Sequence, residues 1–381
     1  MRSGYDVVVV GGGLVGTALA YELACLGSTV GLIDRADAGR ASDAGAGILS
    51  PETTWRTDDV WFPFAAEAGA HYPRLVERLT EDGAPDAGYG RTGLLSLSLS
   101  DGDESWWEDL ARHACARAPD AVAEISTDQA RELMPVLGEL RRALFNRAAA
   151  RVDGRTFTAA LRCGCHSRGV DIIDARAERL VTSGHSVTAV DTSVGRVGAD
   201  TVVLAAGAWT PELSHHLSVT LPVRPVKGQI VHLRVDDEGL APREWPIAQP
   251  VLGHYLVPWP DGRVACGGTF EERGTFDPRA TAAGTHELLR ECLKLAPGLA
   301  EASLLEVRVG FRPCTDDDLP FLGPVPGWER LYVDTGHGAD GLLAGPYSGA
   351  VLATGVLGQE ATLTDAGRRA LAAFSPARSV A

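Results

Sequence analysis

The sequence predicts an α/β protein, α+β overall, in which a nucleotide-binding domain is interleaved with a second domain. Three observations lead to this prediction: a glycine-rich turn between a strand and a helix at the start of the chain, later strands that complete the same sheet, and strands of a different character between them. The length of 381 residues suits two or three domains. Hydrophobic residues make up 45% of the chain, which is typical of a globular protein.

The chain opens with a predicted strand and a dinucleotide-binding turn. Residues 5–10 form a continuous apolar run rich in valine, as expected of a strand buried on both faces. Gly11, Gly13 and Gly16 follow with the spacing G-x-G-x-x-G. The first glycine permits the tight turn, the second lets the backbone approach a pyrophosphate, and the third lets the next helix pack closely on the strand.

A helix and a second strand complete this unit. Apolar residues at helical spacing predict a helix over residues 14–26, and the free N–H groups of its first turn, at Leu14 and Val15, face the phosphates. The second strand ends at Asp34, whose carboxylate can accept hydrogen bonds from ribose hydroxyls. Asp34 also argues against a 2′-phosphorylated cofactor, although Arg35 beside it weakens that argument.

Composition argues against several other classes of protein. The net charge is −15 at pH 7 and no basic block stands out, so we expect neither a nucleic-acid partner nor an anionic membrane partner. No apolar run is long enough to span a membrane, and the N-terminus does not have the pattern of a signal peptide. The seven cysteines lack C-x-x-C pairs and the histidines are scattered, which favours reduced thiols in the cytoplasm and no metal site. A homo-oligomer is left open.

The first unit is too short to be a complete domain, so later segments must complete its sheet. The candidates are a buried strand within residues 199–209, which ends in small residues that include Gly207, and a strand within residues 331–338. Between them, residues 60–135 are expected to be helical and residues 221–272 to contain several strands. We therefore expect a discontinuous nucleotide domain of residues 1–85, 145–215 and 305–381, and a substrate domain of residues 86–144 and 216–304.

A second G-x-G-x-x-G run begins at Gly336, after the last of these strands. Too little chain remains for a second dinucleotide unit, so the alternatives are a plain helix start or a helix N-terminus that faces a flavin ring. A helix N-terminus would stabilise the negative charge that develops when the ring is reduced. The residues expected there are Gly338, Ala339, Asp340, Gly341 and Leu342.

Four blocks of sequence resemble the D-amino-acid oxidase (DAO) superfamily of FAD-dependent oxidoreductases. They are residues 41–51, 225–229, 309–320 and 334–338, and their order and spacing are similar to those of the superfamily. The likeness is greatest to the glycine oxidase and D-amino acid dehydrogenase branches. It implies a Rossmann-type FAD-binding domain interleaved with a substrate domain built on a mainly antiparallel sheet with helices.

The resemblance also implies the cofactor and its contacts. The cofactor would be FAD, with its adenosine end at the first glycine turn and Asp34. The loop that would flank the ring system contributes Ser42, Ala44, Gly45 and Gly47. Sarcosine-oxidase-type members attach flavin to a cysteine in roughly the block of Cys314, but the residues after Cys314 do not match their pattern, so we expect non-covalent FAD.

Arg312 is the residue expected to bind the substrate. A guanidinium offers a planar fork of donors that matches a carboxylate, and the matching arginine of the superfamily holds the carboxylate of its substrate. We also expect Arg312 to contact the cofactor. The alternative is a structural arginine that pairs with one of the acids Asp316, Asp317 and Asp318.

Four further side chains are considered at this site. His254 and Tyr255 correspond to the strand that faces the substrate in relatives, and because side chains alternate along a strand only one of them can point to the site. His337 borders the flavin motif, where ordering the backbone is as good an explanation as catalysis. Lys227 is the sole lysine suited to promote oxygen reduction, although a structural role is favoured.

The function that follows is FAD-dependent oxidation of the CH–NH bond of an amino acid or secondary amine. Hydride would pass from Cα to flavin N5, giving an imine that hydrolyses to a 2-oxo acid, and this needs positioning and exclusion of water rather than a dedicated base. The alternatives are a 2-hydroxy-acid dehydrogenase, a sarcosine-oxidase-like N-methyl amino acid oxidase, and a flavin-binding subunit or sensor without turnover. Relatives that oxidise glycine carry an arginine where this chain has Ala339, which argues for a larger or amine-bearing substrate.

Overall fold

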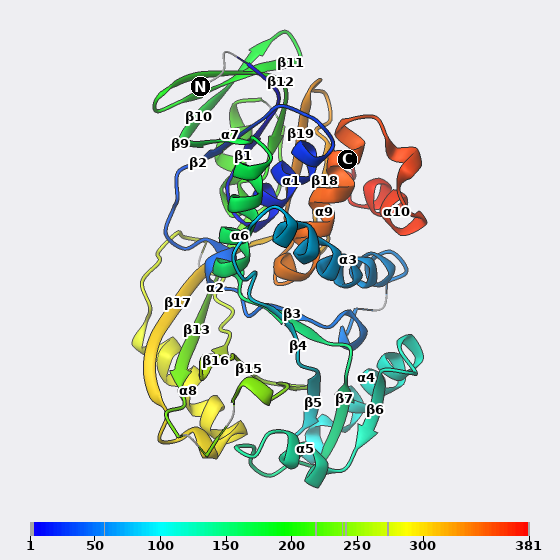
Figure 1. Cartoon of the computed structure of the whole chain (residues 1–381), viewed down its shortest axis with the longest axis vertical. Coiled ribbons are helices and arrows are strands. Elements are labelled where there is room, and N and C mark those ends of the chain that lie inside the picture. The colour runs from blue at the N-terminus through cyan, green and yellow to red at the C-terminus, as the bar shows by residue number, and fades with distance from the viewer. Residues whose placement is uncertain are drawn as a thin grey trace.

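The computed structural model describes residues 4–56, 58–217, 219–237, 239–240, 242–272 and 274–379. Two eight-stranded sheets form the two ends of the molecule, and the strands β3 and β4 of a three-stranded sheet lie between them (Figure 1). Helices accompany both large sheets, so the predicted fold class, α/β and α+β overall with interleaved halves, is confirmed.

The first sheet is mostly parallel and contains the unit predicted at the start of the chain. Strands β9, β2, β1, β12 and β19 are parallel neighbours in that order, β18 is antiparallel to β19, and the hairpin β10–β11 extends β12. The two strands predicted to complete this sheet are β12 and β19. The bounds are β1 (Tyr5–Val10), β2 (Val30–Asp34), β9 (Asp171–Asp174), β10 (Ala177–Ser183), β11 (Ser186–Thr192), β12 (Gly195–Leu204), β18 (Phe321–Pro324) and β19 (Leu331–Thr335).

Strand β1 is buried on both faces, as its apolar run predicts. Val7 and Val9 pack into a core that includes side chains of several helices, whereas Val8 and Val10 pack with apolar residues of β10 and β11. Four of these helices are α1 (Leu14–Cys25), α3 (Trp61–Glu81), α6 (Gly154–Ser167) and α9 (Gly341–Val356). None of the helices in the described part of the chain combines the length and apolar character needed to cross a bilayer.

The second sheet is antiparallel except for one parallel pair, β14 and β5. Its strand order is β17-β13-β16-β15-β14-β5-β7-β6, and α8 packs on β13 and β16. The bounds are β5 (Leu94–Ser98), β6 (Val122–Ile125), β7 (Arg142–Asn146), β13 (Arg224–Arg234), β14 (Ile247–Pro250), β15 (Tyr255–Pro258), β16 (Arg263–Gly267) and β17 (Ser303–Cys314). The small sheet has β3 (Ile48–Leu49), β8 (Ala150–Val152) and β4 (Tyr89–Arg91), and the other helices are α2 (Ala41–Ala44), α4 (Glu104–Arg117), α5 (Thr127–Leu133), α7 (Thr210–Ser214), α8 (Ala282–Leu295) and α10 (Asp365–Ala373).

The expectation that residues 60–135 are helical is only partly correct. This segment contains α3, α4 and α5, but it also contains β4, β5 and β6. Strand β5 is buried along its whole length and pairs with β7 and β14, which lie far away in the sequence. Local periodicity cannot reveal a short strand whose stability comes from such distant partners.

Candidate active site

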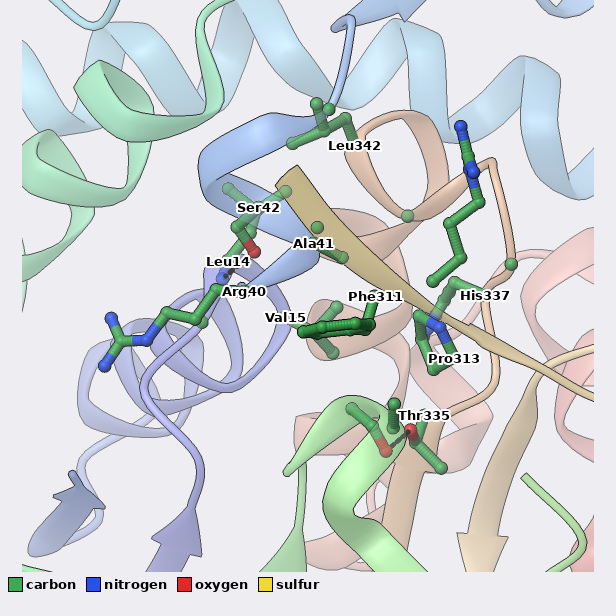
Figure 2. A pocket seen from close by; sticks show the side chains of 18 of the residues that line it. Leu14, Val15, Arg40, Ala41, Ser42, Phe311, Pro313, Thr335, His337 and Leu342 are labelled. Atoms are coloured by element: carbon green, nitrogen blue, oxygen red, sulfur yellow. Dashed lines mark hydrogen bonds between the residues drawn. The ribbon is translucent and has the colours of Figure 1, made fainter. Parts of the chain in front are cut away.

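A cavity of about 410 Å³ lies between the carboxyl ends of the parallel strands and the second sheet. Its wall combines the turn after β1, the loop around α2, the ends of β12 and β19, the start of α9, and parts of β13, β15 and β17. Ligands of α/β sheets bind at such carboxyl ends. Figure 2 shows part of the wall, with Phe311 of β17 in the middle and Val15, Ser42 and His337 around it.

Most of the residues that the sequence singles out line this one cavity. They are Gly11, Gly13, Leu14, Val15, Asp34, Arg35, Ser42, Ala44, Gly45, Gly47, Gly207, Tyr255, Arg312, His337, Gly338, Ala339, Asp340, Gly341 and Leu342. Gly16, His254, Lys227 and Cys314 are not part of the wall. Sequence reasoning missed further wall residues, among them Gly12, Arg40, Trp55, Gln249 and Phe311.

The glycine turn is required by close backbone packing. Gly11 has a φ of +114°, and a Cβ there would lie 2.3 Å from the carbonyl oxygen of Ala205. A Cβ on Gly16 would lie 1.9 Å from the carbonyl oxygen of Gly11, so its absence lets α1 pack against the turn. A Cβ on Gly12 would lie 2.6 Å from Cγ of Asp34. The run of three glycines at residues 11–13 could have indicated this close contact from the sequence.

Asp34 is held by two arginines that sequence reasoning did not connect with it. Arg40 forms an ion pair with its Oδ2, and Nη1 of Arg162 lies 3.5 Å from the same atom. Arg35 points elsewhere, because it pairs with Asp37 and lies 3.7 Å from Glu212. The carboxylate of Asp34 is therefore fixed at the cavity wall.

The loop around α2 joins the glycine turn to the start of α9. The hydroxyl of Ser42 accepts a hydrogen bond of 2.9 Å from the backbone N–H of Leu14, which satisfies one free donor at the α1 N-terminus (Figure 2). A Cβ on Gly45 would lie 2.4 Å from Cδ1 of Leu342, and a Cβ on Gly47 would lie 1.8 Å from the carbonyl oxygen of Val152. Both glycines are therefore needed for close packing.

The start of α9 is supported by a fully buried polar cluster. Nε2 of His337 lies 2.9 Å from Oγ of Ser348 and 3.4 Å from Oδ1 of Asp334, and Ser348 also donates to Asp334 at 3.1 Å. Burial lowers the pKa of His337 to about 4 and raises the pKa of Asp334 to about 8, so both side chains are neutral near pH 7. The His337 ring therefore contacts side chains of both β19 and α9, and its Nδ1 has no hydrogen-bond partner among the described residues.

Arg312 presents an uncompensated positive charge to the cavity. Its Nη1 donates a hydrogen bond of 2.9 Å to the carbonyl oxygen of Thr269, and no carboxylate of the described residues pairs with it. The acids considered as alternative partners lie elsewhere: Asp317 pairs with Arg378 at 2.7 Å, and Asp316 lies 3.7 Å from Arg224. An anionic ligand group would complete this arrangement.

Of the adjacent residues His254 and Tyr255, the structure places only Tyr255 at the cavity. His254 points away, and its Nε2 lies 3.2 Å from Oε1 of Glu287. Burial raises the pKa of Tyr255 to about 12, so the phenol keeps its proton and can donate a hydrogen bond. A Cβ built on Gly268 would lie 3.1 Å from the Tyr255 hydroxyl and 3.1 Å from Nη2 of Arg312, so these two groups lie within about 6 Å of each other.

An acid, Asp340, lies on the cavity wall near α9, next to Ala339. Oδ2 of Asp340 lies 3.7 Å from Nη1 of Arg56, whose guanidinium lies 4.1 Å from the centre of the Trp61 ring. Burial raises the pKa of Asp340 to about 6, and Ala339 beside it carries no charge. The ion pair with Arg56 is one that sequence reasoning missed.

Two reactive side chains considered from the sequence are buried. Cys314 is 4% exposed, and burial raises the pKa of its thiol, so little of it is thiolate. Nζ of Lys227 donates a hydrogen bond of 2.6 Å to the carbonyl oxygen of Arg279, and Lys227 is not part of the cavity wall.

The cavity fits a dinucleotide that carries a flavin ring. A Cβ on Gly13 would meet only Oγ of Ser42, at 3.3 Å, and a Cβ on Gly207 would meet no atom within 4 Å, so the backbone is open to a ligand at both glycines. The same cavity is lined by Asp34, by the N-terminus of α9 and by Arg312. Two helix N-termini, those of α1 and α9, border this space.

Comparison with known proteins agrees with this arrangement. Residues 6–354 match the model of the family described as FAD dependent oxidoreductase (DAO). An uncharacterised oxidoreductase of Bacillus subtilis, YurR, is 36% identical over 98% of this chain and 99% of its own length. Glycine oxidase of Pseudomonas aeruginosa is 33% identical over 93% of this chain and 95% of its own. The crystal structure of iminodiacetate oxidase from Chelativorans sp. BNC1 has a TM-score of 0.89 and 35% identity, covering 97% of this chain and 98% of that one.

These matches extend over nearly the whole chain, and they agree with the resemblance seen in the four sequence blocks. The glycine turn, Asp34, the N-terminus of α9 and Arg312 all lie on this one cavity. The chain belongs to the DAO family of FAD-dependent oxidoreductases and is an enzyme of that family.

Proposed function

We propose that the enzyme oxidises the CH–NH bond of an amino acid or secondary amine with FAD, giving an imine that hydrolyses to a 2-oxo acid. The observation that carries the proposal is Arg312, a guanidinium at the cavity wall without an acidic partner among the described residues. A cation in this state favours a substrate that brings its own carboxylate.

The proposed placement of FAD follows the cavity wall. Its adenosine end lies at the turn of Gly11, Gly13 and Gly16 and at Asp34, and its ring system lies between the α2 loop and the start of α9. We propose that it is held without a covalent bond, because the Cys314 thiol is buried and largely protonated. FAD, when bound, supplies the electron acceptor that takes hydride from the substrate.

The side chains of this enzyme bind, orient and shield the substrate. Arg312 holds the carboxylate, and the neutral hydroxyl of Tyr255 donates a second hydrogen bond beside it. His337 stays neutral and supports the backbone at the start of α9. No general base is required, since the proposed chemistry depends on position and on exclusion of water.

The proposed substrate class is larger than glycine and includes secondary amines. The relatives named glycine oxidase and iminodiacetate oxidase support an amine that carries a carboxylate. Ala339 leaves the wall at the start of α9 without a cation, and Asp340, 3.7 Å from Arg56, adds a carboxylate beside it. This combination disfavours a second carboxylate near α9 and favours a neutral or positively charged group there.

The proposal also includes the division into two domains, the cellular compartment and the partners of the enzyme. Residues 1–85, 145–215 and 305–381 bind FAD, and residues 86–144 and 216–304 bind substrate, except that the pairing of β17 with β13 supports assigning residues 303–314 to the substrate domain. All seven cysteines are free thiols, which supports a reducing compartment such as the cytoplasm. The partner is a small-molecule substrate, without nucleic acid or membrane, and the oligomeric state stays open.

Anaerobic flavin reduction tests the proposal. The holoenzyme is mixed with D- and L-amino acids, N-methyl amino acids and 2-hydroxy acids, and bleaching of the flavin is followed together with ammonia or amine release. The proposal requires bleaching by an amine and release of ammonia or a primary amine. Bleaching by 2-hydroxy acids alone would assign the enzyme as a hydroxy-acid dehydrogenase, and no bleaching at all would indicate a flavin protein without turnover. Acid precipitation, which should leave the flavin in the supernatant, tests the non-covalent attachment.

A further inference from the structure

Arg312 lies in a slot made by glycine backbone. Arg312 is opposite Val226 in the β13–β17 pair, so Gly228 is its diagonal neighbour on the same face of the sheet. A Cβ built on Gly228 would lie 2.4 Å from Nη1, 2.7 Å from Cζ and 2.8 Å from Nη2 of Arg312. On the other side, a Cβ on Gly268 would lie 3.1 Å from Nη2. The guanidinium therefore occupies space that any side chain at Gly228 would fill.

A buried hydrogen-bond network fixes the backbone of this slot from behind. Gln229 and Thr269 exchange two bonds: Gln229 N–H donates to Oγ1 of Thr269 at 2.9 Å, and Thr269 N–H donates to the Gln229 carbonyl oxygen at 3.1 Å. Both side chains also donate to Oε1 of Glu271, at 2.6 and 2.9 Å. Gln229 is 0% exposed and Thr269 is 3% exposed. The Thr269 carbonyl that accepts from Arg312 therefore cannot shift without breaking this network.

We propose that Gly228 is a positioning residue for substrate binding, which sets the direction of the Arg312 guanidinium, while Gln229 and Thr269 hold the slot. The inference rests on the proposed function, because it assumes that Arg312 binds the carboxylate of the substrate. Arg312 uses Nη1 for the Thr269 carbonyl, and its side chain forms part of the cavity wall. The sequence of residues 225–229 does not by itself indicate that Arg312 packs against Gly228.

The variant Gly228→Ala in the holoenzyme tests the inference. The atoms that its Cβ would meet are the end of a flexible side chain, so the enzyme should fold and retain FAD while the guanidinium is displaced. We expect the KM of the best amine substrate and the Kd of acetate, an inert carboxylate read from flavin absorbance, to rise roughly 10-fold to 100-fold. Gly90→Ala is the matched control, because a Cβ on Gly90 meets no atom within 4 Å and Gly90 is outside the cavity wall.

A double-mutant cycle separates positioning from a general structural effect. If Gly228 acts through Arg312, adding Gly228→Ala to Arg312→Ala should change kcat/KM by less than about twofold. Thr269→Val, which keeps the carbonyl but removes the hydroxyl bridge, should raise the acetate Kd by a smaller factor than Gly228→Ala. If Gly228→Ala does not fold, Thr269→Val still tests whether the slot positions Arg312.

Two results would overturn the inference: an unchanged acetate Kd in the folded variants, or an equal effect of Gly228→Ala with and without the Arg312 side chain. A different result addresses the proposed function itself. If Arg312→Ala leaves the affinity for acetate and substrate unchanged, the carboxylate assignment fails, whatever Gly228→Ala does.

Discussion

The two ends of the cavity are built in different ways. The end at Gly11 and Asp34 comes from one continuous stretch, residues 5–34, in which β1, α1 and β2 follow each other directly. The end at Arg312 is assembled from β13, β15 and β17 and from the loop at Gly268, which are far apart in the sequence. The contacts differ as well, because a Cβ on Gly16 would meet backbone, whereas a Cβ on Gly228 would meet side-chain atoms. The turn at the first end is therefore fixed by backbone contacts, whereas the Arg312 side chain at the second end can move.

The largest effect is expected at the fixed end. In Gly16→Ala the new Cβ would lie 1.9 Å from the carbonyl oxygen of Gly11, so α1 must move away from the turn. We expect the purified variant to contain almost no FAD or to be insoluble, as measured by flavin absorbance per protein. Wild-type flavin content in Gly16→Ala would show that this end also adjusts, and the comparison between the two ends would fail. Gly90→Ala again serves as the control.

The next largest effect is expected at Arg312. Arg312→Ala should lower kcat/KM roughly 100-fold or more, with the flavin content and spectrum unchanged, because a charge-assisted bidentate contact is lost. Arg224→Ala is the matched control, since Arg224 lies on the paired strand and already has an acidic partner, Glu272, at 2.9 Å. Loss of flavin from Arg312→Ala would mean that this side chain supports the cofactor as well as the substrate.

A smaller effect is expected at Tyr255. Tyr255→Phe removes one neutral hydroxyl beside Arg312 and should raise KM by about 5-fold to 10-fold, the cost of one hydrogen bond. His254→Ala should leave KM within about twofold, because His254 faces Glu287 and not the cavity. The reverse order of effects would show that the strand presents its other face to the substrate.

A separate effect concerns stability and its dependence on pH rather than substrate binding. Burial raises the pKa of Asp334 from 3.8 to about 8, so the folded enzyme holds this proton more tightly than the unfolded chain. The stability that the bound proton provides is complete below the unfolded value and is lost as the pH rises toward about 8. Between pH 3.8 and about 8, the unfolding temperature of wild type should fall relative to that of Asp334→Asn. The difference in unfolding free energy should change by at most about 1.4 kcal/mol per pH unit.

The control for this titration is Asp200→Asn, at an exposed position. Both holoenzymes are measured with excess FAD. A difference between Asp334→Asn and wild type that is the same at every pH would contradict a buried proton on Asp334.

The sequence predicted the first end far better than the second, for physical reasons. Gly11, Gly13 and Gly16 lie within one strand–turn–helix unit, so their spacing predicts the dinucleotide turn, although Gly11 also packs against the distant Ala205. The ion pair of Asp34 with Arg162 depends on the position of α6, and no local pattern shows it. At the second end, the alternation of side chains along a strand could not decide whether His254 or Tyr255 faces the cavity, and only the structure does so. The slot at Gly228 requires a diagonal contact between two strands and was not predicted.

Strand β17 links the two halves of the molecule near the cavity. The backbone N–H of Phe311 donates to the carbonyl oxygen of Gly39 at 2.9 Å, and the carbonyl oxygen of Pro313 accepts from Gly338 N–H at 2.9 Å. Arg312, between them, therefore shares its backbone with contacts to both the α2 loop and the start of α9. For protein engineering, this makes β17 a poor place to randomise when a new substrate range is sought. Libraries at Gln249 of β14 and Tyr255 of β15 would vary the wall while leaving the strand that connects both halves intact.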